Sequence, residues 1–230
     1  MSRALARWSF IFDFDGTVSP VDMGHAIHDG LGRPAWREID ARWVRGEITT
    51  SRRAHEQFAL IDASQAEFEA LVARHHIDPV FPPLVDDLRA QGAEVEIVSD
   101  GFDFYVSRML AAAGLTDLPF TANGLNFRNG EIVLDFPHER PDGPTGAGWK
   151  VDHVRRAQAC GRRVAYVGDG FSDLQAAPLA DLVFAKSHLA TYCDAEGIAY
   201  HSFSTLDDVR RWVRENLGEL AVRAAVDSDA

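Results

Sequence analysis

The chain has 230 residues, of which 35 are acidic and 23 basic, so its formal net charge is −12. Hydrophobic residues make up 46% of it, which predicts a folded chain with a sizeable core and excludes disorder as the main state. The acidic balance argues against binding to nucleic acid or to an anionic membrane. Two cysteines without CxxC spacing, and no apolar leader before residue 9, favour a cytoplasmic protein.

Short apolar runs predict strands at four places, and helical patterns lie between them. The strands are expected at 9–12, 93–98, 163–167 and 182–184, and the helices at 82–91, 102–113, 148–159 and 205–217. This alternation is typical of an α/β protein with a Rossmann-like, doubly wound parallel sheet. In such sheets ligands bind beyond the carboxyl ends of the strands.

The segment between the first two predicted strands differs, because it contains helical patterns alone. These lie at 23–31, 35–43, 50–60 and 64–75, and the last begins with a capping box at Ser64–Glu67. We therefore expect a helical cap at 19–79, inserted into a core made of 1–18 and 80–230. A small β-hairpin insert is expected at about 121–137, because Asn129-Gly130 is a strong type I′ turn signal.

The first predicted strand runs into Asp13-Phe14-Asp15-Gly16-Thr17. Side chains alternate along a strand, so Asp13 and Asp15 can point the same way at its end. Two neighbouring carboxylates repel each other unless a cation lies between them or one carries a proton. Hard oxygen ligands of this kind favour Mg²⁺.

The next predicted strand ends at Ser99, where a hydroxyl and the following amides can hold a phosphate oxygen. Lys150 begins a helix after a Gly- and Pro-rich loop, where its ammonium can neutralise anionic oxygens. Asp169 and Asp173 follow the third strand in a G-D-x-x-x-D pattern. Acidic residues after strands are also common helix N-caps, but capping does not require the same chemistry after three strands.

Taken in order, these motifs resemble those of the haloacid dehalogenase (HAD) superfamily of phosphatases, over essentially the whole chain. The resemblance implies that Asp13 is a nucleophile that becomes an aspartyl-phosphate. It implies that Asp15 protonates the leaving alcohol and then activates water. It also implies a Mg²⁺ site and a phosphoryl site. The metal ligands would be Asp13, the backbone carbonyl of Asp15, and Asp169. The phosphoryl site would contain Ser99, Asp100, Gly101 and Lys150, supported by Asp173 and Thr17.

A helical insert at this place resembles a type I cap, which closes over small substrates, so a small phosphorylated metabolite is the expected substrate. The second acid, Asp15, favours phosphate ester hydrolysis over dehalogenation. Phosphoserine phosphatases have an acidic substrate residue at a spacing that Asp22 matches. Gln57, however, falls where those enzymes have a substrate-binding arginine. Arg52 or Arg53 could substitute for it from a neighbouring turn, but the stronger expectation is that both lie on an exposed helix face.

The chain is also similar to the 2-hydroxy-3-keto-5-methylthiopentenyl-1-phosphate phosphatase-like family. The similar stretches are DFDGT, VSDGFDFYV, the hairpin before the lysine, and LADLVFAKSHLATYC. Asp100 departs from the pattern of that family, in which a glycine is common. Phe102 is a further candidate for substrate specificity, although helix packing explains it equally well.

Three alternatives to this reading differ in their chemistry. One is phosphoserine hydrolysis, and another is a phosphotransferase or mutase on the same scaffold. The third is a receiver-type signalling module, but such a module is about half as long and has no cap. Trp36 and Trp43 are seven residues apart, a helical period that predicts core packing. The aromatic residues of the expected cap also suggest a possible homodimer.

Overall fold

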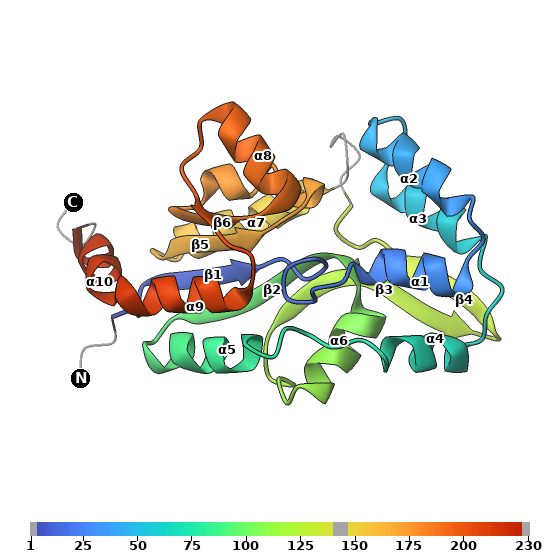
Figure 1. Ribbon diagram of the computed structural model, residues 1–230, viewed down its shortest axis with the longest axis horizontal. Helices are drawn as coiled ribbons and strands as arrows, with labels where there is room; N and C mark the ends of the chain where they lie inside the picture. The colour runs from blue at the N-terminus through green and yellow to red at the C-terminus, as the bar shows by residue number, and fades with distance from the viewer. Residues whose placement is uncertain (1–3, 140–146, 227–230) are drawn as a thin grey trace.

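The computed structural model describes residues 4–139 and 147–226 (Figure 1). These residues contain one sheet of seven strands in the order β4-β3-β2-β1-β5-β6-β7. All neighbouring pairs are parallel except β3 and β4. The strands are β1 (Trp8–Phe12), β2 (Glu94–Phe102), β3 (Phe120–Arg128), β4 (Glu131–Asp135), β5 (Arg163–Gly168), β6 (Leu182–Ala185) and β7 (His201–Ser202). The predicted doubly wound α/β fold is confirmed.

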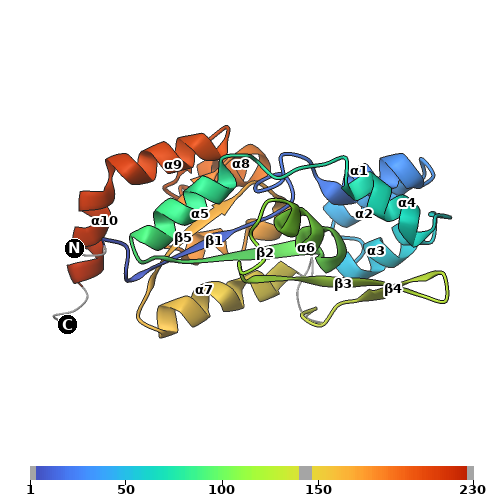
Figure 2. The same ribbon diagram turned by 90° about the horizontal axis from the view of Figure 1, so that it is seen from below.

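Helices cover both faces of the sheet, because the buried strands are apolar on both sides. In β1, Phe10 and Phe12 belong to one core cluster and Ile11 to the other, as the alternation of side chains requires. Figure 2 shows α5 and α9 on one side of the sheet and α7 on the other. Six helices of the described residues belong to this part of the fold. They are α5 (Phe81–Ala90), α6 (Asp103–Ala112), α7 (Lys150–Ala159), α8 (Ser187–Glu196), α9 (Leu206–Glu215) and α10 (Leu217–Val226).

Four helices, which we call the four-helix segment, connect β1 to α5. They are α1 (Met23–Leu31), α2 (Trp36–Val44), α3 (Thr50–Phe58) and α4 (Gln65–Val72), and they gather at the end of the sheet toward which β1 points (Figure 1). The capping box of Ser64 and Glu67 is present. Trp36 and Trp43 are only 5% and 8% exposed, so both are buried, as predicted.

The predicted hairpin joins β3 to β4 through Asn129 and Gly130, whose φ angles of 52° and 85° are both positive, as a type I′ turn requires. The first residues of β3 also pair with β2, so the hairpin prolongs the main sheet toward the four-helix segment. There, Phe127 contacts Phe68 of α4. Within the described residues, no helix has the length and hydropathy needed to cross a membrane.

Candidate active site

Three neighbouring strands deliver polar side chains to the same edge of the sheet. Asp13 follows β1, and its N–H donates to the carbonyl of Val167 (2.9 Å), which extends the pairing of β1 with β5. Asp169 follows β5 directly. Because the order is β2-β1-β5, the structure brings these residues together with Ser99 of β2. This is the carboxyl edge at which α/β sheets bind ligands.

Ser99 lies inside β2 rather than beyond its end, because the strand bulges at this point. Val98 pairs with Thr121 and Phe102 with Asn123, so the stretch of β2 between these pairs is two residues longer than its partner on β3. Bulges re-aim side chains next to active sites. The Ser99 hydroxyl is buried and accepts the N–H of Gly101 (3.0 Å).

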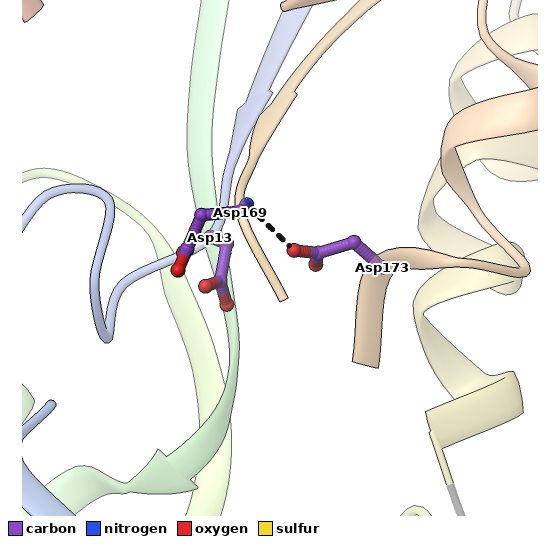
Figure 3. Close-up of side chains that lie close together, drawn as sticks. All are labelled: Asp13, Asp169 and Asp173. Carbon is purple, nitrogen blue, oxygen red and sulfur yellow. Dashed lines mark hydrogen bonds between the residues drawn. The ribbon is translucent and has the colours of Figure 1, made fainter. Parts of the chain in front are cut away.

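Carboxylate oxygens of Asp13, Asp169 and Asp173 lie within 4.8 Å of one another. Figure 3 shows the carboxylates of Asp13 and Asp169 next to each other, while that of Asp173 points toward the backbone nitrogen of Asp169. Asp173 ends the short 3-10 helix η2 (Phe171–Asp173) and is fully buried. The three carboxylates therefore form a candidate cation site.

Asp173 differs from the other two because both of its oxygens are fully occupied. Its Oδ2 accepts the N–H groups of Asp169 and Gly170, each at 3.0 Å. Its Oδ1 accepts the Lys150 ammonium (2.8 Å) and the Tyr166 hydroxyl (2.7 Å). A carboxylate has about four acceptor positions, so Asp173 orients its neighbours, and the oxygens left for a cation belong to Asp13 and Asp169.

Lys150 is the first residue of α7, and its side chain is 0% exposed. The Gly- and Pro-rich loop before it includes residues 140–146, which lie outside the described residues. Its ammonium donates to Asp13 Oδ1 (2.6 Å), Ser172 Oγ (2.8 Å) and Asp173 Oδ1. Burial opposes the charge, but the carboxylates of Asp13 and Asp173 raise the pKa of Lys150 well above its usual value, so the ammonium stays charged.

Asp15 lies two residues after Asp13 and is held on both oxygens. Oδ1 accepts the N–H of Met23 (2.8 Å), and Oδ2 accepts the hydroxyl of Tyr105 (2.6 Å). Burial, and then the charge of Asp22, raise the pKa of Asp15 to about 7. A carboxyl group that titrates near neutrality can both donate and accept a proton.

Gly16 lets the loop after β1 lie against Asp169. Its φ of +81° is unfavourable for other residues, and a Cβ there would overlap the Asp169 carboxylate. The next residue, Thr17, donates from Oγ1 to Asp169 Oδ1 (2.7 Å). Thr17 was predicted to support the site, and its hydroxyl holds one oxygen of Asp169.

Asp100 lies between Ser99 and Gly101 in the bulged stretch of β2, and it lines a cavity at this edge of the sheet. Its Oδ1 accepts the indole N–H of Trp149 (3.1 Å), and its backbone carbonyl accepts the side-chain amide of Asn123 (2.8 Å). Its Oδ2 is buried without a hydrogen-bond partner in the described part of the chain. Burial raises the pKa of Asp100 above its ordinary value.

A cavity of about 450 Å³ lies between this edge of the sheet and the four-helix segment. Asp13, Asp15 and Asp169 line it, together with the three specificity candidates predicted from the sequence: Asp22, Gln57 and Phe102. Two of these candidates already have local partners. Asp22 accepts the N–H of His25 as the N-cap of α1, and the Gln57 amide donates to the carbonyl of Trp36.

The expectation that Arg53 lies on an exposed helix face is wrong. Its side chain is 21% exposed, lines the cavity, pairs with Asp40 (3.3 Å) and stacks on the Trp43 ring (4.0 Å). Its Nε is buried and has no hydrogen-bond partner among the described residues. Arg53 and Gln57 are four residues apart, so helical periodicity places both on one face of α3. Arg52, in contrast, is 65% exposed, as expected.

The profile of the haloacid dehalogenase-like hydrolase family matches residues 10–178. A 2-hydroxy-3-keto-5-methylthiopentenyl-1-phosphate phosphatase of Brevibacillus brevis is 30% identical over 88% of this chain and 93% of its own. The chain belongs to the haloacid dehalogenase-like hydrolase family. A phosphatase with the same name from Exiguobacterium sibiricum is 30% identical over 86% of this chain and 92% of its own.

Solved structures of family members share the fold. A phospho-aspartyl intermediate analogue of phosphoserine phosphatase superposes with a TM-score of 0.70 at 19% identity, covering 90% of this chain and 98% of the other. A substrate-bound phosphoserine phosphatase gives 0.69 at 19% identity, over 90% and 97% of the two chains. The resemblance inferred from the motifs is confirmed. The names of the relatives agree with the predicted enzyme class, phosphoric monoester hydrolase.

Replacing Asp173 by Asn should destabilise the protein strongly. The substitution removes one charge of a buried ion pair and leaves the Lys150 ammonium partly uncompensated, at a cost of about 3–5 kcal/mol. Urea unfolding in the presence of a chelator measures this loss without a metal contribution. The control is Asp207→Asn, since Asp207 is 52% exposed and pairs with Arg211 on a helix surface. Equal unfolding midpoints for the two variants would contradict the role of the buried pair.

Proposed function

We propose that the chain is a Mg²⁺-dependent phosphatase that hydrolyses a small phosphorylated metabolite through an aspartyl-phosphate on Asp13. The observation that carries this proposal is the environment of the Asp13 carboxylate. One of its oxygens is held by the Lys150 ammonium at 2.6 Å, and the carboxylate lies beside that of Asp169 at a cavity wall. Such a carboxylate can attack phosphorus while the surrounding charges neutralise the phosphoryl oxygens.

The donor set fits a hard divalent cation. Asp13 and Asp169 would hold it, with the backbone carbonyl of Asp15 as a third ligand, while Asp173 has no acceptor position left. Thr17 already orients one oxygen of Asp169. Two carboxylates, water and a phosphate oxygen are the usual surroundings of Mg²⁺. A bound Mg²⁺ would supply positive charge between these carboxylates and the phosphoryl group.

The residues of the chain then have distinct roles in two steps. In the first, an Asp13 oxygen bonds to phosphorus, the bond from phosphorus to the alcohol oxygen breaks, and Asp15 gives its proton to that oxygen. In the second, Asp15 takes a proton from water as the water attacks phosphorus, and Asp13 is released with inorganic phosphate. Lys150 keeps its charge throughout. Ser99 and the amides of Asp100 and Gly101 are the proposed phosphoryl donors.

The four-helix segment is the proposed cap, and its residues would select the substrate. Arg53 is a stronger candidate for this than Gln57, because Arg53 lines the cavity with a charged group, whereas the Gln57 amide is bonded to a backbone carbonyl. Arg53 can donate to a carboxylate, carbonyl or hydroxyl at the far end of the substrate. It also keeps phosphoserine hydrolysis as the second candidate function, since phosphoserine carries a carboxylate.

The direct test is phosphate release from a panel of phosphorylated metabolites. The panel should contain O-phosphoserine and 2-hydroxy-3-keto-5-methylthiopentenyl-1-phosphate, together with sugar phosphates assayed with added sugar acceptors. Hydrolysis to free phosphate supports a phosphatase, whereas transfer to a sugar would identify a phosphotransferase. An enzyme that is inactive on every member would contradict the proposal.

The Asp13→Asn variant should lose turnover of an aryl phosphate in Mg²⁺ by at least about 10³-fold, because an amide cannot form the covalent intermediate. Steady-state release of the phenol measures this loss. Circular dichroism of the variant should match that of the wild type. Retained turnover in a folded variant would refute the assignment of the nucleophile.

Removal of divalent metal should abolish turnover, and added Mg²⁺ should restore it. The acidic cluster binds a cation only through oxygen ligands, so a chelator such as EDTA competes with it effectively. The measurement is the rate of phosphate release before chelation, after chelation and after addition of Mg²⁺. A rate that resists chelation would contradict the role of the metal.

Replacing Arg53 by Met should raise KM at least about tenfold for substrates with an acidic or hydroxylated far end, since it removes charged hydrogen bonds. An aryl phosphate without such groups should be affected much less. The matched control is Arg52→Met, which removes an exposed arginine from the same helix. Equal effects of the two variants on KM would remove Arg53 from the substrate site.

A further inference from the structure

Tyr105 is a buried tyrosine that the sequence motifs do not assign to the site. It lies in the first turn of α6, is 1% exposed, and packs against Phe14 with the ring centroids 6.0 Å apart. Its hydroxyl donates to Oδ2 of Asp15 at 2.6 Å. A buried phenol normally finds a hydrogen-bond partner, but here the partner is the carboxylate to which the proton transfers are assigned.

The backbone makes room for this contact at Gly101. A Cβ on Gly101 would overlap both the Tyr105 hydroxyl and Asp15 Oδ2. The absence of a side chain at Gly101 therefore allows the phenol and the carboxylate to meet. On the other side of the carboxylate, the N–H of Met23 donates to Oδ1 at 2.8 Å.

These contacts make the two oxygens of Asp15 unequal. Oδ2 accepts the Tyr105 hydroxyl at 2.6 Å, whereas the Ser99 hydroxyl lies 3.4 Å away and is the proposed donor to the phosphoryl group. Oδ1 accepts only the Met23 amide among the described donors, which leaves it one position. The Tyr105 hydroxyl points its proton at Oδ2 and is the shorter contact, 2.6 Å against 2.8 Å from the Met23 N–H, so Oδ2 is the acceptor and the proton of the acid form belongs on Oδ1.

We propose that Tyr105 is a positioning residue for Asp15, which holds Oδ2 as an acceptor so that Oδ1 carries the proton given to the leaving oxygen. The inference rests on the proposed phosphatase function. As the Asp13 oxygen bonds to phosphorus, the electron pair of the breaking P–O bond stays on the alcohol oxygen. The proton of Oδ1 moves to that oxygen, and the resulting Asp15 carboxylate keeps the hydrogen bond from Tyr105.

The test follows from the dependence of the rate on the leaving group. A phosphate ester of an acidic phenol expels its leaving group without a proton, whereas an ester of a simple alcohol needs one. The constant kcat/KM covers the steps up to release of the alcohol and excludes hydrolysis of the intermediate. Measured over a series of aryl and alkyl phosphates, it isolates proton donation by Asp15.

Tyr105→Phe keeps the ring and removes only the hydroxyl. We expect its kcat/KM to fall about tenfold more on the alkyl phosphates than on p-nitrophenyl phosphate. The matched control is Tyr166→Phe, because Tyr166 is equally buried and its hydroxyl donates to another carboxylate, Asp173. That variant should lose similar factors on both kinds of substrate, since Asp173 and its partner Lys150 act on the phosphoryl side.

The outcomes separate the two proposals. If the wild type hydrolyses the series and Tyr105→Phe loses the same factor on every substrate, the positioning role is refuted while the phosphatase stands. If the wild type hydrolyses none of them, both proposals fail. A steeper dependence on the leaving group in Tyr105→Phe, absent in Tyr166→Phe, supports the positioning role, because lost packing or folding would lower all rates together.

Discussion

The buried ammonium of Lys150 is the interaction on which this edge of the molecule depends. It joins the start of α7 to the loop after β1 and to η2, through Asp13, Ser172 and Asp173. A lysine side chain that is fully removed from water is costly unless its donors are all paired. Here each of its three protons has an acceptor. The same charge that stabilises the fold therefore fixes the orientation of the Asp13 carboxylate.

The positive charge of Lys150 also offsets part of the negative charge around the cavity. A chain of net charge −12 places six aspartates on the wall of one cavity, which by itself repels a phosphate: Asp13, Asp15, Asp22, Asp40, Asp100 and Asp169. Lys150 lies behind this wall, and Arg53 lies on it. Among the described residues, these two cations face six carboxyl groups, and a divalent metal held between Asp13 and Asp169 would reduce the imbalance where the phosphoryl group is proposed to bind. The acidity of the cavity is thus itself an argument for a metal.

The sequence predicted those parts of the fold and site that depend on short-range patterns. Short apolar runs located β1 and β5, and the acidic residues that follow these runs pointed to Asp13 and Asp169. The two-residue strand β7 is too short to have a period, and the bulge that carries Ser99 depends on pairing with β3. Contacts between residues far apart in the sequence, such as Tyr105 with Asp15 or Trp149 with Asp100, leave no local pattern from which they could be predicted. The place of Arg53 at the cavity could have been predicted from the sequence, because Arg53 lies one helical turn before the specificity candidate Gln57.

The position of Asp15 would link the proposed substrate selection to the proposed proton transfer. Its carboxyl group is held by Tyr105 from the core helix α6 and by the first residue of α1, Met23. The same helix contributes His25 and His28 to the cavity wall. Because one short helix both holds the acid and lines the cavity, a substitution that reshapes α1 for another substrate also moves a donor to Asp15. Tyr105 lies outside the four-helix segment, so its hydrogen bond to Asp15 does not depend on the shape of α1.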